Sequence, residues 1–398
     1  MKVLLVSTSE GGGGGIAARR LLEALCKNGV EAKMMVRDKQ SADPRVVKVG
    51  SRLPKIIERL AILPRCGFRH SQLWQTDIAN VGIGITATRE FREADVVHLH
   101  WVCQGMISLD EMGKILSSRK RIVWTLHDEW PYLGVCHYRG ECKEKECRKC
   151  PLLCGSLPYC IYKKKHAMYG QWHPTFVGCS QWITDEARKA MPAERVEHIN
   201  NCIPSALFRP IDMLQARKAL ALPTDKRLLL FCSQKVTDER KGIAYLAEAL
   251  DRLHRDDVHL AIVGKDSEQI PLPGNLSITR FGSVGEEAMP TLYNAADVFL
   301  TPSLQDNLPN TIAEAMSCGT PCVGFDIGGI PEMIDHKQSG YVARYRDAAD
   351  LAEGIRYVLS HDLRQAACEK AAKAFDEAHV ARQYMSLYTQ SDYSEHSE

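Results

Sequence analysis

The segment Thr301–Gly329 (TPSLQDNLPNTIAEAMSCGTPCVGFDIGG) constrains the fold of this chain more than any other segment. It continues the apolar run Val298–Thr301, which is typical of a strand buried in a parallel sheet. The turn formers of Pro302–Asn310 predict an irregular loop, and Pro309 suits the first turn of a helix that continues through Ile312–Met316. A strand that leads through a loop into a helix predicts an α/β sheet with an anion site at the helix N-terminus.

Two acidic residues bracket this helix start. Asp306 lies in the predicted loop and Glu314 lies on the predicted helix, eight positions apart. This separation is about two helical turns, so both carboxylates are expected to face one cleft. Backbone amides would then bind phosphate, and the carboxylates would bind a hydroxyl-rich group. The alternative is a helix-capping loop with a glutamate on the surface.

The whole string resembles the acid-x7-acid signature of glycosyltransferase family 4. The resemblance includes EAMSCGTPCVG from the second acid onward, the NLPN loop and the trailing GGIPEMI. It implies that Glu314 binds the ribose of a nucleotide sugar and that Asp306 has a catalytic role in orienting the transferred sugar. The first acid of the family is usually glutamate, and Asp306 is one methylene shorter. The residues expected to complete the donor site are Asn307, Leu308, Pro309 and Asn310.

A second set of donor-binding residues is expected after a new strand at Arg227–Phe231. Lys241 lies at the start of the helix that follows, where a cation is disfavoured unless an anion is bound. The resemblance implies that a basic pair here neutralises the donor diphosphate during catalysis, with Lys241 as its second member. Lys235 and Arg240 are the alternatives for the first member, and Phe281 follows a further strand where the family binds the base. Ordinary surface charge is the competing interpretation of these cations.

The N-terminal part opens with an apolar strand at Lys2–Ser7, five glycines at Gly11–Gly15 and a helix at Ile16–Asn28. This order is typical of the first βα unit of a doubly wound sheet. The glycines do not form G-x-G-x-x-G, so a dinucleotide fingerprint is not indicated. The family resemblance implies that this loop lies near the donor phosphate and the acceptor, where Gly14 and Gly15 would let the backbone approach closely. A flexible loop without a ligand is the alternative.

Three histidines lie in or after predicted strands. His98 and His100 lie on one side of the strand Asp95–Trp101 by alternation. His127 follows the strand Arg121–Leu126 at its carboxyl end, where doubly wound sheets bind ligands. The family resemblance implies a histidine near the transferred sugar at this position. We therefore expect a catalytic role for His127 and structural roles for the other two.

The chain has 15 cysteines, and those between residues 136 and 160 form its least ordinary segment. Several thiols close together in a reducing compartment favour a tetrahedral metal clip over disulfides. Such a site has no open position for chemistry and would order an insertion at about residues 134–160. Free thiols in a loop are the alternative. The segment also resembles an insertion in family 4 transferases of surface-polysaccharide pathways, of the colanic-acid type. The expected ligands of this structural zinc ion are Cys136, Cys142, Cys147 and Cys150.

Composition limits the classes of partner. A net charge of +2 over 398 residues gives no drive toward nucleic acid. No run approaches the roughly 20 apolar residues of a membrane span, and the apolar start Val3–Val6 is too short for a signal peptide. We therefore expect a cytoplasmic protein. The basic and apolar residues of Arg52–His70 and the cluster Lys163–Lys165 could form a peripheral contact with anionic lipid at the inner face of the membrane. Solvated helix faces explain them equally well.

These observations predict a GT-B fold of two Rossmann-like doubly wound domains that face a cleft. The domains are expected at residues 1–205 and 206–378, with residues 379–398 returning to the first domain as a helix. The resemblance implies a retaining transferase that moves a sugar from a UDP- or GDP-sugar to a glycan or polyprenyl-linked acceptor in surface polysaccharide synthesis, without a catalytic cofactor. The alternatives are a nucleotide-sugar epimerase of the same fold and a non-catalytic scaffold that binds the donor.

Overall fold

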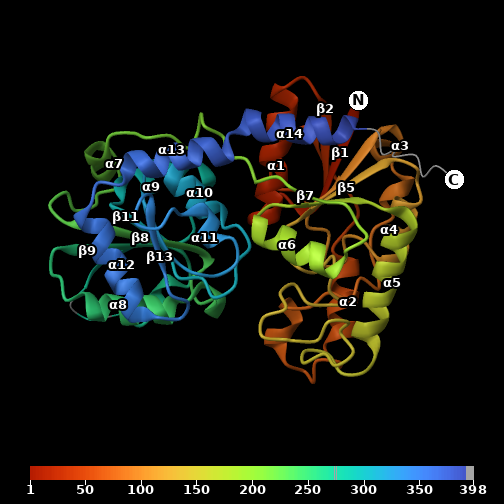
Figure 1. Cartoon of the computed structure of the whole chain (residues 1–398), viewed down its shortest axis with the longest axis horizontal. Coiled ribbons are helices and arrows are strands. Elements are labelled where there is room, and N and C mark those ends of the chain that lie inside the picture. The colour runs from red at the N-terminus through yellow and green to blue at the C-terminus, as the bar shows by residue number, and fades with distance from the viewer. Residues whose placement is uncertain (273, 275, 391–398) are drawn as a thin grey trace. The chain divides into compact units, whose positions relative to one another are not determined.

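The chain divides into two compact units, as Figure 1 shows. The computed structural model describes residues 1–272, 274 and 276–390. The first unit consists of Met1–Cys202 and the residues from Glu377 onward, and the second unit is Ile203–Asp376. The domain boundaries predicted from the sequence lie after residues 205 and 378.

The first unit is built on a seven-stranded parallel sheet with the strand order β3-β2-β1-β4-β5-β6-β7. Its strands are β1 (Lys2–Ser9), β2 (Glu31–Asp38), β3 (Val46–Lys48), β4 (Val96–Leu99), β5 (Arg121–Leu126), β6 (Thr175–Gly178) and β7 (Val196–His198). The order reverses between β1 and β4, which is the topological switch point where doubly wound sheets bind ligands. The carboxyl ends of β1, β4 and β5 therefore form the expected ligand edge of this unit.

Helices cover this sheet because its strands are apolar on both faces. In β1 the run Val3–Thr8 is buried without interruption, as in other parallel sheets. The helices are α1 (Gly12–Lys27), α2 (Leu53–Ile62), α3 (Arg89–Glu93), α4 (Leu109–Leu116), α5 (Leu157–Trp172), α6 (Gln181–Ala190) and α14 (Glu377–Thr389). No helix in the described ranges has the length and apolar content needed to cross a membrane.

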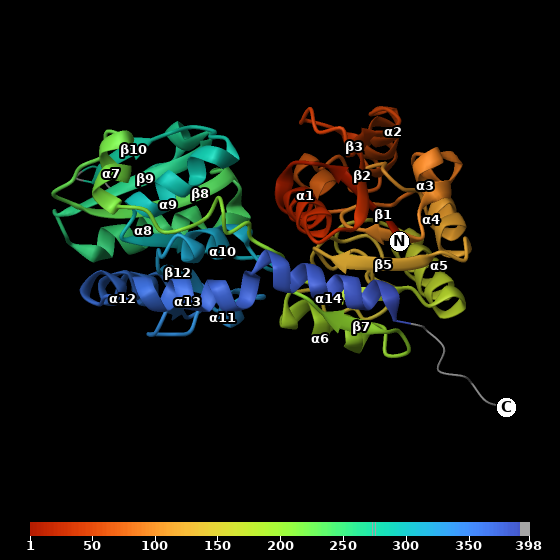
Figure 2. The same cartoon turned by 90° about the horizontal axis from the view of Figure 1, so that it is seen from above.

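The last helix, α14, completes the first unit. It packs beside α1 and runs along the sheet (Figure 2). The Tyr388 hydroxyl lies 2.7 Å from His98 Nδ1, and the Tyr384 hydroxyl lies 3.0 Å from Thr125 Oγ1. The final helix is therefore bound to buried polar groups of β4 and β5 as well as to the apolar core.

The second unit is a six-stranded parallel sheet with the order β10-β9-β8-β11-β12-β13. Its strands are β8 (Arg227–Lys235), β9 (Val258–Lys265), β10 (Ser277–Arg280), β11 (Val298–Thr301), β12 (Cys322–Phe325) and β13 (Gly340–Ala343). Its helices are α7 (Met213–Ala219), α8 (Ile243–Leu253), α9 (Met289–Ala295), α10 (Asn310–Ser317), α11 (Ile330–Met333), α12 (Ala348–Ser360) and α13 (Arg364–Phe375). The switch point lies between β8 and β11, so the segments after these two strands meet at the ligand edge.

The fold class predicted from the sequence is confirmed, but three local predictions are wrong. Helix α1 begins at Gly12 with Gly11 as its N-cap, so four of the five glycines form a helical turn and not a loop. Pro309 is the N-cap of α10 and precedes its first residue, Asn310. Lys165 is fully buried within α5, so only Lys163 and Lys164 of the predicted surface cluster are exposed.

Candidate functional site

The loop after β11 is fixed against the start of α8. Gly242, the residue before α8, has a φ of +68°, and a side chain there would overlap the carbonyl oxygen of Pro302. The Leu304 amide donates to the carbonyl oxygen of Arg240 at 2.7 Å. These contacts hold Lys241 beside the irregular loop that follows β11.

Asp306 and Lys241 form the charged centre of this edge. The Lys241 ammonium donates to Asp306 Oδ2 at 2.6 Å, and the Ser303 hydroxyl donates to the same oxygen at 3.1 Å. Both side chains of the ion pair are partly exposed. An anion that binds Lys241 would therefore compete with Asp306, and the released carboxylate could accept hydrogen bonds from hydroxyl groups. Ser303 was not singled out from the sequence, although it lies in the same string.

Glu314 is anchored by a buried tyrosine. Only 6% of Glu314 is exposed, and the Tyr293 hydroxyl donates to Glu314 Oε2 at 2.7 Å. The same hydroxyl lies 3.8 Å from the Cys232 sulfur. Burial and then the Glu314 charge raise the pKa of Cys232 to about 12, whereas the Lys241 charge acts on that pKa in the opposite direction. Glu314 and Lys241 therefore both lie near Cys232, and Lys241 also binds Asp306. The two acids predicted as a pair thus lie at the same edge of the sheet.

The turn after β12 fixes the loop from its other side. Gly328 has a φ of +57°, and a side chain there would overlap the carbonyl oxygen of Asp306. The Gly329 amide donates to the carbonyl oxygen of Asn307 at 2.7 Å. The two glycines that follow β12 therefore determine where the main chain of the loop lies.

The start of α10 contributes main-chain groups to the same edge. Pro309 has no N–H, so Asn310 carries the first N–H of the helix. Asn307 and Leu308 are buried and shape the loop. This part of the predicted donor site therefore contributes through its backbone, and the positive end of α10 favours an anion there.

The candidates for a second cation have other partners. Arg240 donates to Asp238 at 2.6 and 3.1 Å. The exposed Lys235 lies 3.7 Å from Asp266. The structure therefore identifies neither residue as the partner of Lys241 in an anion site.

The end of β10 is tied to β9 at Phe281. The Phe281 amide donates to the carbonyl oxygen of Ile262 at 2.9 Å, and the Gly264 amide donates to that of Gly282 at 2.6 Å. Gly264 has a φ of +139°, and a side chain there would overlap the carbonyl oxygen of Ser233. Phe281, the predicted base-binding position, thus lies near Gly264. At Gly264 the strands β9 and β8 approach so closely that only glycine fits.

In the first unit, the start of α1 closely approaches the ends of β1 and β5. A side chain at Gly15 would overlap the carbonyl oxygen of Ser9. A Cβ atom at Gly14 would lie 3.0 Å from Trp101 Cβ and 3.1 Å from His127 Cδ2. The structure therefore brings together Gly14 and His127, two residues that the sequence selected separately.

His127 is paired with His100. His100 Nδ1 lies 3.0 Å from His127 Nε2, and the rings stack with centroids 5.2 Å apart. Burial lowers the pKa of His127 to about 4, and burial together with the neighbouring histidines lowers the pKa of His100 well below its usual range. Both rings are neutral at pH 7, so one nitrogen of the pair donates and the other accepts. His127 is therefore a hydrogen-bonding group and not a cation.

His98 in β4 and His100, which follows the end of β4, lie on one side with ring centroids 4.3 Å apart, as alternation predicts, but have different roles. His98 binds the hydroxyls of Tyr388 and Thr125, both at 2.7 Å, and so has the structural role expected for it. His100 instead positions His127, which the sequence analysis missed. The sequence did contain a signal for this role. Alternation puts His98 and His100 on one side of their strand, and His127 follows the carboxyl end of the neighbouring strand.

The four cysteines expected to bind zinc lie between β5 and α5. Cys136 and Cys147 are buried, Cys142 and Cys150 are partly exposed, and all four are free thiols. A hydrogen bond joins the side chains of Cys136 and Cys150. The structure thus brings two of the four predicted ligands into contact.

Helix α2 exposes apolar side chains. Leu53, Ile56 and Leu60 are 60%, 54% and 63% exposed. Glu58, the acid of this helix, is buried and pairs with Arg59 at 3.0 Å. The exposed face of α2 therefore carries no negative charge of its own.

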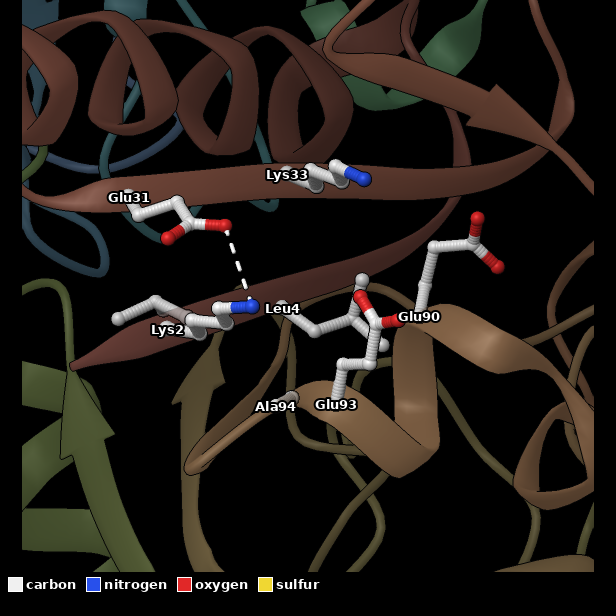
Figure 3. Close-up of a pocket in the computed structure, with 8 residues that line it drawn as sticks. Lys2, Leu4, Glu31, Lys33, Glu90, Glu93 and Ala94 are labelled. Carbon is white, nitrogen blue, oxygen red and sulfur yellow. Dashed lines mark ion pairs between the residues drawn. The ribbon is translucent and has the colours of Figure 1, made fainter.

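A shallow depression on the first unit lies away from the ligand edge (Figure 3). Its charged lining residues are Lys2, Glu31, Lys33, Glu90 and Glu93, and Lys2 pairs with Glu31 at 3.6 Å. Strands β1 and β2 begin here, whereas doubly wound sheets bind ligands at the carboxyl ends of their strands. The depression is therefore not a candidate for the functional site.

Known proteins match this chain in sequence. Residues 226–361 match the family described as glycosyl transferases group 1. This range contains Lys241, Asp306 and Glu314. The chain is also 26% identical over 407 residues to the D-inositol 3-phosphate glycosyltransferase of Mycobacterium sp. strain JLS, with 92% of this chain and 83% of that protein covered.

Solved structures match the chain over nearly its whole length. Sucrose-phosphate synthase from Thermosynechococcus elongatus has a TM-score of 0.67 at 18% identity, with 97% of this chain and 98% of that chain covered. Anabaena HepE, solved in complex with UDP-glucose, has a TM-score of 0.67 at 17% identity, with 98% and 100% covered. At these identities the likeness establishes the fold and not the ligand.

Proposed function

Because this chain is a glycosyltransferase of the GT-B fold whose residues 226–361 match group 1, we propose a specific reaction for it. The reaction is transfer of a sugar from a UDP- or GDP-sugar to a glycan or polyprenyl-linked acceptor in surface polysaccharide synthesis, with retention of configuration. The observation that carries the proposal is the Lys241–Asp306 ion pair on the same edge as Glu314. The UDP-glucose bound in HepE supports a nucleotide-sugar donor.

Lys241 would stabilise the leaving group. Negative charge develops on the diphosphate as the bond between the anomeric carbon and the β-phosphate oxygen breaks. A positioned ammonium and the positive end of α10 stabilise that charge more than they stabilise the ground state. The acceptor hydroxyl forms the new bond on the same face of the sugar, and its proton passes to the departing phosphate oxygen. No side chain of the protein attacks the sugar in this scheme.

The two acids would bind different parts of the donor. When the diphosphate takes Lys241, the Asp306 carboxylate is released and accepts hydrogen bonds from hydroxyls of the sugar. Glu314 accepts a ribose hydroxyl while Tyr293 holds its carboxylate in place. Hydrogen bonds from hydroxyls to buried carboxylates are strong, because one partner is charged.

His127 would bind a hydroxyl of the transferred sugar. It is neutral at pH 7, and His100 holds its Nε2 atom. This contact occupies Nε2 of His127 and leaves Nδ1 to bind the hydroxyl. Gly14 allows the start of α1 to lie against the same ring.

We also propose that α2 and the segment after it contact anionic lipid, which would bring a polyprenyl-linked acceptor near. More than half of the large exposed apolar side chains in the described structure lie between residues 53 and 74, including Phe68 and Trp74. Basic residues accompany them, as amphipathic membrane-surface segments require. These basic residues are Arg52, Lys55, Arg65 and Arg69.

Vesicle sedimentation tests this contact. Vesicles with anionic lipid should bind the protein at low salt, whereas neutral vesicles should not. Leu60→Ser should weaken binding, and Leu214→Ser, which changes an exposed leucine of the second unit, should leave it unchanged. Equal binding of both variants would contradict the proposed surface.

The reaction itself is tested by incubating the protein with UDP- and GDP-sugars, with and without a lipid-linked acceptor. Nucleotide released only in the presence of acceptor, together with a product of retained anomeric configuration, supports the proposal. An isomerised donor would indicate an epimerase, and binding without turnover would indicate a scaffold. Either of these outcomes would replace the proposed reaction.

A further inference from the structure

The segment between β5 and α5, residues 127–156, contains neither a helix nor an extended strand. Irregular segments of this length are uncommon inside compact domains unless they are functional or disordered. This one is well packed, because Trp130, Tyr132, Cys136 and Cys147 are buried. Its order therefore needs a physical source other than regular secondary structure.

Backbone N–H groups point at two sulfur atoms of this segment. The Gly134 amide donates to Cys147 Sγ at 3.2 Å, and the Leu153 amide donates to Cys150 Sγ at 3.4 Å. Hydrogen bonds of this kind orient metal ligands and tune their charge. A Cβ atom at Gly134 would also crowd Cys147, at 3.1 Å from its Cβ and 3.2 Å from its Sγ.

Two further sulfur atoms complete the group. Cys136 shares a hydrogen bond with Cys150, and Cys142 is close enough to Cys136 and Cys147 to act on both electrostatically. Sulfur atoms around a tetrahedral zinc ion lie about 3.8 Å apart, given a Zn–S bond of about 2.3 Å. Among the described residues no three of these sulfurs lie within 4.8 Å of one another. An ion would therefore draw the loop inward around itself.

We propose that Cys136, Cys142, Cys147 and Cys150 bind one zinc ion, which holds this segment in its fold. Zinc prefers four thiolates in a closed tetrahedral site, and each thiol releases its proton to solvent on binding. The resulting site has two net negative charges. Residues 139–149 contain five basic and three acidic side chains, and their net charge of +2 offsets the site.

A second group of donors competes for the assignment. Asp77, Cys103 and His137 are buried, and their donor atoms all lie within 4.8 Å of one another. Asp77 already has a cationic partner, because Arg59 donates to it at 3.2 Å. A metal ion here would have to replace this ion pair, so the four cysteines are the better site.

The zinc ion would stabilise the ligand edge of the first unit from outside. Asp128, which follows His127, accepts from Trp101 Nε1 at 2.7 Å and shares a hydrogen bond of 2.7 Å with His137 Nδ1. His137 is the next residue after Cys136, so the metal would hold this network in place. Loss of zinc should loosen the first unit and leave nucleotide binding by the second unit unchanged.

The test measures the metal content of the full chain, purified with a reductant and without a chelator. We expect one zinc per chain by elemental analysis, with loss of the metal in Cys136→Ser and Cys150→Ser. Cys154→Ser changes an exposed cysteine of the same segment and should keep the metal. Cobalt added to the reduced wild-type protein should give the charge-transfer absorption of a tetrahedral thiolate site, which does not depend on the variants folding.

Three results would overturn the proposal. One is a wild-type protein that contains no zinc and binds no cobalt. Another is a metal that His137→Gln loses and Cys150→Ser keeps, because it would place the ion in the Asp77 group. The third is fewer than 15 titratable thiols in the unfolded protein without reductant, because a disulfide would then order the segment.

Discussion

Replacing Lys241 with alanine tests the proposed donor site directly. In the ligand-free protein the Lys241 ammonium lies 2.6 Å from Asp306 Oδ2, and in the proposed complex it neutralises the diphosphate. Removal of one positioned donor to a developing oxyanion lowers kcat by about 100- to 1000-fold, or about 2.7–4 kcal/mol. The variant should reach the upper part of this range, because the Asp306 carboxylate would remain uncompensated beside the diphosphate.

Asp306→Asn is the matched variant, since it removes the negative partner and keeps the ammonium. Binding of the nucleoside diphosphate, measured by calorimetry, should weaken by about tenfold or more in Lys241→Ala, because a hydrogen bond to a charged group contributes about 1.5–3 kcal/mol. Asp306→Asn should bind the diphosphate at least as tightly as the wild type and still lose sugar transfer. Lys370→Ala, which breaks a surface pair with Asp335, should change neither quantity.

Nucleotide release with acceptor provides the rate. A loss in kcat/KM of less than about fivefold in Lys241→Ala, which corresponds to about 1 kcal/mol, would refute the assigned role. The reasoning would also fail if Asp306→Asn bound the diphosphate more weakly than Lys241→Ala.

Three further predictions use residues described above. Glu314→Ala should abolish binding of the nucleotide sugar as measured by calorimetry. Tyr293→Phe should weaken this binding by about fivefold, because one hydrogen bond of about 1 kcal/mol is lost. Wild-type affinity in Glu314→Ala would contradict its role in binding the ribose. Burial lowers the pKa of His127 to about 4, so the unfolded state takes up a proton below about pH 6.5 before the folded state does, and stability falls as the pH drops from 6.5 toward 4. His127→Gln should therefore flatten the unfolding free energy against pH by up to about 1.4 kcal/mol per pH unit in this window, and parallel curves for variant and wild type would argue against a buried neutral ring. Gly15→Ala should destabilise the protein by about 2 kcal/mol or more in urea denaturation, since its Cβ would overlap main chain. Gly13→Ala adds a Cβ with nothing within 4 Å and should be neutral or stabilising; similar losses in both glycine variants would show that helix geometry, and not the close approach, sets the cost.

Local patterns predicted the strands and helices that form the ligand edges. Val298–Thr301 and Arg121–Leu126 are strands with the expected bounds, because short apolar runs between turn formers leave few alternatives. The limits of α1 and α10 were less predictable. Glycine and proline indicate where a helix can start, but the neighbouring strand decides which residue takes the first helical conformation.

The site was predictable where one segment carries it and not where distant segments meet. Asp306 and Glu314 lie on one string, whereas Tyr293 reaches Glu314 from another helix, so no spacing rule could indicate it. Lys165 was expected on the surface because charged residues usually are. In the structure its ammonium lies over the Trp130 ring and donates to the Trp130 carbonyl oxygen, a partner supplied by a distant loop.

Because α14 belongs to the first unit, ribosomal synthesis must pass Glu377 before that unit can finish folding. The whole second unit, Ile203–Asp376, emerges between the two parts, which takes roughly 10–35 s at ordinary elongation speeds. Throughout this interval the nascent sheet lacks its covering helix, and His98 lacks the tyrosine that binds it. Nascent chains stalled before residue 377 should thus be cut readily by protease in their N-terminal part and should recruit chaperones there.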